Sequence, residues 1–492
     1  MFWRGVVGYL PMNIVQGLVG FGSIFIFTRA LTPAEFGVYA LAFSAMSLGH
    51  TLTFTWLEAA MARFYAPQAQ AGRLSDHFAT LYRCWLGAAA AFVAVGGAGL
   101  ALWPGDGPIK LAVGAGMAAT LARSLAKLNQ ERRRAAGDVR GAALMDMAQT
   151  LAGLAIGVGL IWAGLIHAGP MHAGLGGAAP IAGLGAAAAV VLVFLLPAEL
   201  KRGGGGAFEA RQARTYAAYG VPVALSLIFA LALATTDRFL LAAYLGDAAV
   251  GVYQAGYSLA NRTLDVMFIW LGAAGGPALI VALERGGAAA LAKAAREQSG
   301  LMLALALPAS LGLALVARPL TQVMVGPALA AGAAQVTPWI AASALFAGLT
   351  TYYTHQAFTL GRRTGLLLLA MAIPAALNVA LNLLLIPRLG LTGALVATTA
   401  SYGVGFVASV LLGRRAQPLP LPLGALARPA VAAALMGAVV TQLPSLGGLA
   451  ELALKAGVGA LVYALAAFAL DVAGVRSRGK DAVLILRTRM AT

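Results

Sequence analysis

Arg262 is a cation within an otherwise apolar stretch of sequence. It lies 13 residues into the apolar segment 249–277, which is roughly 20 Å along a helix that rises about 1.5 Å per residue. A charged side chain is costly inside a membrane, so a charge there is by default a candidate functional residue. Two interpretations remain open. Arg262 binds an anionic group, or it pairs with Asp265, three residues later on the same helix face.

Further ionisable residues lie near the ends of other apolar segments. Arg63 and Arg83 either contact an anion or extend toward lipid headgroups. Glu58 is a carboxylate for a coupled ion or a partner for Arg63. The adjacent Asp237 and Arg238 form a gating ion pair or a binding site, of which the ion pair is favoured.

Neutral amides and the remaining polar residues carry weaker signals. Asp146 is expected to be solvated at a span end. The two histidines of HAGPMHAG have no nearby carboxylate or cysteine, so no metal site is predicted. The sequence contains no P-loop motif, so direct use of ATP is not expected. Four amide side chains are candidate sugar ligands, although each could instead form a hydrogen bond between helices: Asn13, Gln16, Gln254 and Asn261.

The composition indicates a polytopic membrane protein. Hydrophobic residues make up 60% of the 492 residues and charged residues only 10%, against about 25% in soluble proteins. Windows of about 20 apolar residues, the length that spans a bilayer, recur throughout. They predict fourteen spans: 8–28, 36–62, 79–103, 108–128, 142–165, 178–199, 216–236, 249–277, 298–316, 336–358, 364–386, 392–412, 425–443 and 450–471.

The net charge of +17 is a topology signal and does not predict nucleic-acid binding. With the N-terminus in the cytoplasm, most Lys and Arg fall on the cytoplasmic side, as the positive-inside rule requires. An even number of spans then places the C-terminus in the cytoplasm too. The loops are short, so no soluble catalytic domain is expected. The outer exceptions are six: Arg29, Lys110, Arg238, Arg318, Arg388 and Lys455.

An internal repeat divides the chain. LTPAEFGVYALAFS at 31–44 returns as LGDAAVGVYQAGYS at 245–258. Both copies lie at an outer turn, and an even number of spans separates them, so the two halves run parallel. Parallel repeats are a known plan of transporters, with the substrate site at their interface. By itself the motif is a structural corner, with Pro33 in the first helical turn and Tyr39 and Tyr253 as interfacial anchors.

This organisation predicts an all-α protein with two parallel six-helix lobes around a central cavity and two extra C-terminal helices. The predicted parts are an N-lobe at 1–200, a glycine-rich cytoplasmic linker at 201–214, a C-lobe at 215–415, helices 13 and 14 at 416–472 and a cytoplasmic tail at 473–492.

Three stretches resemble the bacterial polysaccharide flippases of the multidrug, oligosaccharidyl-lipid and polysaccharide exporter superfamily. TRALTPAEFGVYALAFS is similar to their first hairpin, although Thr32 replaces the usual Gly. TTDRFLLAAYLGDAAVGVYQAGYSLANR (235–262) and LNVALNLLLIPRLGLTGALVATTASYGV (377–404) are similar to the regions of helices 7–8 and 11–12. The likeness covers most of 10–412.

The resemblance implies transport without covalent chemistry, so no enzyme activity. A polyprenyl-pyrophosphate-linked oligosaccharide would move from the inner to the outer leaflet of the cytoplasmic membrane by alternating access. Arg262, Arg63 and Arg83 would then contact the pyrophosphate, the four amides the sugars, and Glu58, Asp237, Arg238 and Asp265 would serve coupling or gating.

The expected partners are the polyprenyl-linked glycan, membrane lipids and other polysaccharide-assembly proteins. No cofactor is expected apart from a coupling Na⁺ or H⁺. An ion-coupled multidrug antiporter of the same superfamily, which would export organic cations, is the alternative. An integral-membrane glycan polymerase or acyltransferase is disfavoured because the outer loops are short.

Overall fold

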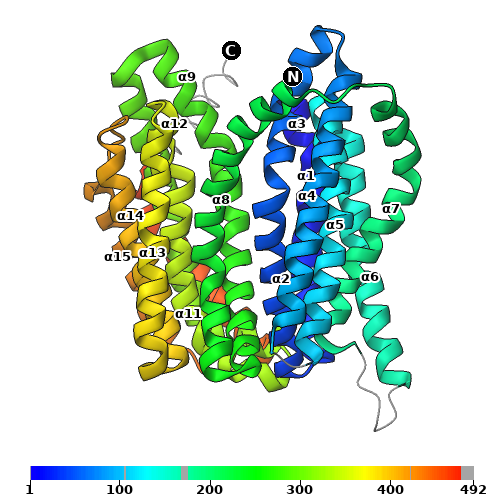
Figure 1. Ribbon diagram of the computed structural model, residues 1–492. Coiled ribbons are helices and arrows are strands. Elements are labelled where there is room, and N and C mark those ends of the chain that lie inside the picture. The colour runs from blue at the N-terminus through cyan, green and yellow to red at the C-terminus, as the bar shows by residue number, and fades with distance from the viewer. Residues whose placement is uncertain (1, 105–106, 168–174, 422, 478–492) are drawn as a thin grey trace, which may run out of the picture. The chain divides into compact units, whose positions relative to one another are not determined.

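The fold is known from a computed structural model, which describes residues 2–104, 107–167, 175–421 and 423–477. For 2–11, 13, 165–167 and 423–425 it describes the backbone alone. Every regular element of the described residues is a helix (Figure 1). The chain divides into two compact units, unit 1 (Met1–Gly251) and unit 2 (Val252–Thr492).

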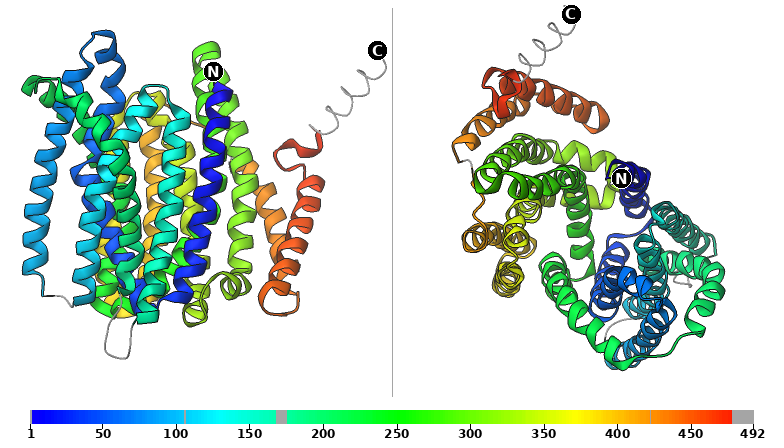
Figure 2. Two further views of the ribbon diagram at one scale, coloured as in Figure 1. Left: turned by 90° about the vertical axis from the view of Figure 1, so that its right-hand side faces the viewer. Right: turned by 90° about the horizontal axis from the view of Figure 1, so that it is seen from above.

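Unit 1 is a bundle of long helices joined by short turns. Figure 2 shows its helices running up and down beside one another. The close pairs include α6 with α7, α5 with α7, and α3 with α8. Its elements are α1 (Phe2–Ala30), α2 (Pro33–Thr53), α3 (Thr55–Gln70), α4 (Leu74–Leu102), α5 (Gly107–Ala135), α6 (Val139–His167), η1 (Gly176–Ala178), α7 (Ala179–Gly204) and α8 (Ala210–Leu245).

Unit 2 contains most of α9, a helix of 69 residues that bends at Gly287, whose φ is 62°. The last two helices pack against each other, and α16 also contacts α10. The elements are α9 (Asp247–Leu315), α10 (Ala317–Met324), α11 (Pro327–Leu349), the π-helical turn η2 (Thr350–Thr354), α12 (Gln356–Leu360), α13 (Thr364–Leu389), α14 (Leu391–Gly413), α15 (Leu423–Thr441), α16 (Gly448–Ala469) and η3 (Val472–Gly474).

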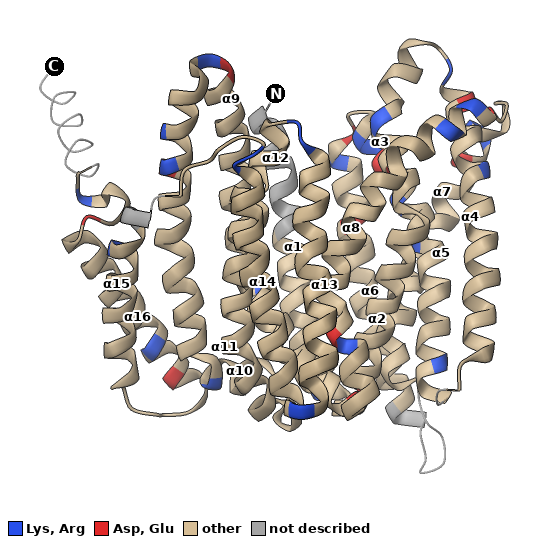
Figure 3. Ribbon diagram, turned by 60° about the vertical axis from the view of Figure 1, so that its left-hand side comes forward, with Lys and Arg blue, Asp and Glu red and all other residues tan. Residues whose placement is uncertain are grey.

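The all-helical membrane fold expected from the sequence is confirmed. Within the described residues, ten helices are long and apolar enough to cross a membrane. Helix α9 carries two of the predicted spans. The predicted span 36–62 is divided into α2 and α3 at the buried residue Phe54, where the backbone leaves ideal helical geometry (φ −117°). Charged residues of unit 1 gather toward the end where α3 meets α4, and the helix middles are mostly apolar (Figure 3).

The first corner ends α1 and starts α2 with a capping box. The Thr32 side chain accepts a hydrogen bond from the Glu35 backbone N–H, and the Glu35 carboxylate accepts one from the Thr32 N–H at 2.9 Å. Pro33 occupies the first turn, where no N–H is needed. Threonine in place of the glycine usual in the resembled family therefore has a local role, because its hydroxyl satisfies an otherwise unpaired donor.

The glycines shared by the two copies of the repeat allow a direct backbone contact. A Cβ atom on Gly37 would overlap the carbonyl of Asp247, and a Cβ on Gly251 would overlap the carbonyl of Pro33. The N-terminal turns of α2 and α9 thus pack at a separation that only glycine permits. Tyr253 differs from the prediction. It is fully buried, and its hydroxyl lies 3.3 Å from that of Thr398, so it is no interfacial anchor.

The glycine-rich segment before α8 is attached to α4. Gly203 and Gly204 still belong to α7. The N–H of Ala207 donates to the Asp76 carboxylate at 2.8 Å, and the N–H of Glu209 donates to the Thr80 hydroxyl at 3.2 Å. A composition typical of a flexible linker here serves close packing, since a Cβ on Gly206 would overlap the carbonyl of Ser75.

The loop between α5 and α6 is ordered by Asp138. Its carboxylate accepts hydrogen bonds from the Gly141 N–H and from Arg133, each at 2.9 Å. The Gly141 N–H, followed by the Arg133 guanidinium, holds the pKa of the exposed Asp138 carboxyl below its usual range. The loop is therefore fixed in place at neutral pH.

The contact between the two corners predicts the effect of enlarging Gly37. In Gly37→Val the side chain collides with backbone that cannot rotate away, so we expect a loss of about 2–4 kcal/mol of stability. The measurement is thermal unfolding in detergent. Gly87→Val on α4, where a Cβ meets no atom within 4 Å, is the control. Equal melting temperatures for Gly37→Val and the control would contradict the contact.

Candidate functional site

Glu58 is the centre of a buried group of charges in unit 1. Its side chain is 8% exposed. His50 Nε2 of α2 lies 2.8 Å from one carboxylate oxygen, and Lys127 Nζ of α5 lies 3.8 Å from the other. The sequence analysis offered Arg63 as the partner, which is wrong, because Arg63 is exposed and the cations beside Glu58 come from other helices. The nearest partners of the Glu58 carboxylate are therefore the His50 imidazole and the Lys127 ammonium group.

A second charged group surrounds Arg123, which lies four residues before Lys127 on α5. The guanidinium interacts electrostatically with Asp146, which is the strongest of its charged neighbours, and also with Glu58. The Asp146 carboxylate accepts a hydrogen bond from the Gln16 amide of α1. Asp146, which was expected to be a solvated surface residue, is partly exposed, and its contacts join α1, α5 and α6.

A third carboxylate of unit 1, that of Glu199 in α7, was not singled out from the sequence. It is 6% exposed, accepts hydrogen bonds from Tyr82 and Arg202, and lies 3.3 Å from Arg132 Nη2. These contacts fasten α7 to α4 and α5. The Glu199 carboxylate is already bound by these three side chains, so we assign it a structural role.

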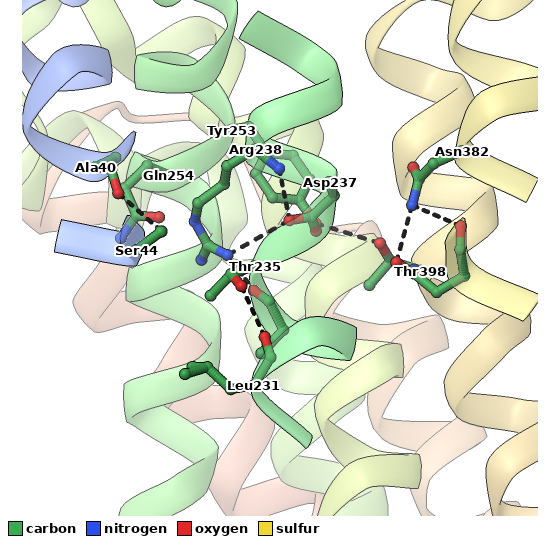
Figure 4. A network of polar contacts seen from close by, with 12 residues as sticks. Ala40, Ser44, Leu231, Thr235, Asp237, Arg238, Tyr253, Gln254, Asn382 and Thr398 are labelled. Atoms are coloured by element: carbon green, nitrogen blue, oxygen red, sulfur yellow. Dashed lines mark hydrogen bonds and ion pairs between the residues drawn. The ribbon is translucent and has the colours of Figure 1, made fainter. Parts of the chain in front are cut away.

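Asp237 and Arg238 of α8 are buried side by side, with exposed fractions of 0% and 5%. An Arg238 Nη1 atom lies 3.4 Å from an Asp237 oxygen (Figure 4). Arg238 also donates to the carbonyl of Ala234. Thr235 donates to the carbonyl of Leu231 at 2.7 Å on the same helix. The ion-pair interpretation of Asp237 and Arg238 is confirmed, while a gating role stays a prediction.

Arg262 of α9 differs from these groups. Its side chain is exposed, and among the described residues no hydrogen bond or ion pair involves it. Asp265, the partner considered for it, accepts a 2.6 Å hydrogen bond from Asn261. The Arg262 charge still acts on Asp265, but the two do not form a closed pair. The guanidinium is therefore available to a ligand.

The remaining predicted residues fall into three groups. Gln254 donates to Ser258 on its own helix at 2.7 Å. Arg63 and Arg83 are both exposed, on α3 and α4 respectively. The side chain of Asn13 and the histidines of HAGPMHAG lie outside the described residues. Among the residues that are described, no three His, Cys, Asp or Glu side chains gather as a metal site would need.

Unit 2 buries further polar side chains that sequence reasoning used only as markers of resemblance. Asn378 and Asn382 of α13 are both fully buried, and the Asn382 amide donates to the Asn378 carbonyl at 2.9 Å. Tyr352 lies in the π-helical turn η2, its ring stacked 6.1 Å from Phe268 of α9. Local π-helix is often found at functional sites.

Sequence reasoning missed His50, Arg123 and Lys127, although a signal was present. Arg123, Lys127, Glu131 and Arg134 recur every three or four residues and therefore share one face of α5. The sequence analysis placed Arg123 and Lys127 within the span 108–128 and did not consider the face that they share with the following loop residues.

Comparison with known proteins shows what the chain is similar to. Residues 176–330 match the sequence model of a family described as polysaccharide biosynthesis protein. No curated protein matches the sequence. The chain is similar to the lipid II flippase MurJ in an inward closed conformation, with 12% identity, 95% of this chain and 98% of that chain covered, and a TM-score of 0.74.

Transporters of another branch have the same fold. An inward-facing MATE family multidrug resistance transporter of the MOP superfamily matches with 14% identity over 82% of this chain and 94% of that one, with a TM-score of 0.62. A MATE transporter of Vibrio cholerae matches with 16% identity, 84% and 96% coverage and a TM-score of 0.53. The chain therefore has the fold of MOP-superfamily flippases and transporters, which confirms the resemblance seen in its corners.

The Glu58 group predicts a specific response to mutation. In Glu58→Leu the charges of Lys127 and Arg123 lose their buried acceptor, and we expect a loss of about 1.5–3 kcal/mol of stability. In the double variant Glu58→Leu with Lys127→Met, part of that loss should return, because no unpaired ammonium remains. Thermal unfolding of both variants in detergent measures the coupling. Strictly additive effects would contradict the pairing.

Proposed function

We propose that the protein is a flippase that moves a polyprenyl-pyrophosphate-linked oligosaccharide from the inner to the outer leaflet of the cytoplasmic membrane. The observation that carries the proposal is Arg262, an exposed guanidinium deep within a span and without a hydrogen-bonded or ion-paired protein partner among the described residues. A cation kept in such a place at high cost serves an anionic cargo.

The charge balance supports an anionic cargo. In unit 1 each buried acid has cations of its own: Glu58 has His50 and Lys127, Asp237 has Arg238, and Glu199 has arginines from α5 and α7. Carboxylates that are neutralised in this way offer little to an organic cation. A guanidinium, in contrast, binds phosphate oxygens through paired hydrogen bonds.

The matched family segment supports a glycan as the rest of the cargo. Residues 176–330, which match a polysaccharide-biosynthesis family, include Arg262 and its neighbours on α9. The fold is that of a structure named as a lipid II flippase, so a lipid-linked substrate fits both comparisons. As in the resembled family, the reaction would be translocation without bond cleavage, so the protein would not be an enzyme.

Individual roles follow from position and charge. Arg262 would hold the pyrophosphate, and the exposed Arg63 and Arg83 would receive it at the cytoplasmic side. The amides of Asn13, Gln16, Gln254 and Asn261 would contact sugar hydroxyls. Na⁺ or H⁺ would couple through Glu58 or Asp265, while Asp237 and Arg238 would act in gating. Both termini would lie in the cytoplasm, and other polysaccharide-assembly proteins would be partners.

The alternative function is an ion-coupled multidrug antiporter. It is favoured by the likeness to MATE transporters and by the buried carboxylate of Glu58. Against it stands the pairing of Glu58 with two cations on neighbouring helices.

Arg262→Gln tests the flippase proposal. The amide keeps the approximate size of the side chain but removes its charge, so we expect at least a tenfold loss of export with normal membrane insertion. Arg262→Lys should retain partial export because it keeps a point charge without the fork geometry. The measurement is the leaflet location of the polyprenyl-linked oligosaccharide in cells that lack the natural protein and carry each variant.

Arg285→Gln is the matched control, because Arg285 is an exposed arginine of the same helix and should export normally. Cells without the protein should accumulate the lipid-linked oligosaccharide in the inner leaflet. An unchanged leaflet distribution together with lost drug resistance would support the antiporter instead.

A further inference from the structure

We propose that unit 1 binds one acyl chain of an anionic phospholipid in an apolar pocket between α2, α4 and α5, with the lipid phosphate at Lys110. This site is distinct from the Glu58 group and from Arg262, and it does not rest on the identity of the cargo.

The pocket has a volume of about 270 Å³. An engineered apolar cavity of about 150 Å³ already binds benzene, so this pocket has room for a longer hydrocarbon segment. Its walls come from α2, α4 and α5 and from Trp103, which follows α4 directly. They are almost entirely apolar: Ala45, Met46, Phe92, Gly96, Gly99, Leu100, Trp103, Val113, Met117 and Thr120.

Two glycines of α4 create the space. A Cβ on Gly99 would meet no atom within 4 Å, so the pocket is open beside this residue. At Gly96, one turn deeper, a Cβ would lie 2.6 Å from the Met117 methyl group. The pocket is therefore open beside Gly99 and bounded by the Met117 side chain beside Gly96.

The chemistry of the walls selects hydrocarbon over water. The Thr120 hydroxyl already donates to the carbonyl of Gly116 at 2.8 Å, and apolar cavities stay dry. The neighbouring surface of α4 is apolar and open, with Val95 75% and Leu102 83% exposed. In a membrane that surface faces lipid, so an acyl chain is the filler at hand.

The depth of the pocket matches one leaflet. Its lining residues on α5 run from Val113 to Thr120, which is roughly 10 Å along the helix. Half of a hydrocarbon core is about 15 Å. A chain that enters beside Trp103 and Val113 would therefore end within its own leaflet.

Charge at the mouth of the pocket specifies the headgroup. Lys110 lies three residues before Val113 and seven before Met117, so the three share a face of α5. Trp103 lines the pocket and is 42% exposed, as expected of an indole at the membrane interface.

The test uses a matched pair of glycine variants on α4. Gly99→Leu places a side chain in the pocket, whereas Gly97→Leu, where a Cβ also meets no atom within 4 Å, lies outside the lining. The purified full-length chain is reconstituted in nanodiscs of phosphatidylcholine with brominated phosphatidylglycerol. The quenching of Trp103 is the difference between the fluorescence quenching of the chain and that of its Trp103→Phe variant. Retained lipid is counted by native mass spectrometry.

We expect saturable quenching of Trp103 and one retained phosphatidylglycerol for the unmodified chain and for Gly97→Leu, and neither for Gly99→Leu. Lys110→Gln should lower the preference for phosphatidylglycerol over phosphatidylcholine about fivefold, the effect of one lysine near an anionic surface. Equal quenching in both glycine variants would overturn the proposal. So would stronger protection of Trp103 by polyprenyl phosphate than by phosphatidylglycerol, or the absence of headgroup preference in the unmodified chain.

Discussion

A charge in a hydrocarbon environment must be neutralised, and this constraint orders most of the polar chemistry of the protein. Taking an ion out of water costs several kcal/mol even after the surroundings relax. In unit 1 the cost is offset by polar and charged partners on neighbouring helices, such as His50 and Lys127 beside Glu58. These contacts also join helices that are distant in sequence. Within the described part of the chain no hydrogen bond or ion pair involves Arg262, which distinguishes it from the charges that hold the helices together.

Close backbone approach is the second organising feature. Gly37 and Gly251 occupy equivalent positions in the two copies of the repeat, and each lies against a backbone carbonyl of the other copy. Gly183 is pressed against Gly157 in the same way within unit 1. Small residues let membrane helices pack tightly. Gly99 uses the same absence of a side chain for the opposite purpose, since it leaves space for a ligand.

The helices could be predicted because hydropathy acts locally, and the corners because Pro33 and the repeated glycines restrict the backbone locally. The partners of Glu58 could not be predicted. Arg63 is near Glu58 in sequence, but the observed partners, His50 and Lys127, come from α2 and α5, and only the tertiary packing brings them together. The contacts of Asp146 could not be predicted for the same reason, since Gln16 and Arg123 interact with it from other helices. Arg262 was singled out because one charge in the middle of an apolar segment is itself a signal, whereas Lys127 lies at the end of its predicted span, where basic residues are common.

The central claim is that the protein carries an anionic lipid-linked glycan through a site that contains Arg262. Its most direct test is transport by the purified protein in vesicles, with a fluorescent short-chain prenyl-pyrophosphate oligosaccharide as cargo and a reductant outside to report the leaflet. The account predicts rapid, protein-dependent movement that organic cations do not inhibit and that Arg262→Gln abolishes. Uptake of an organic cation against an ion gradient, with no movement of the pyrophosphate lipid, would contradict it.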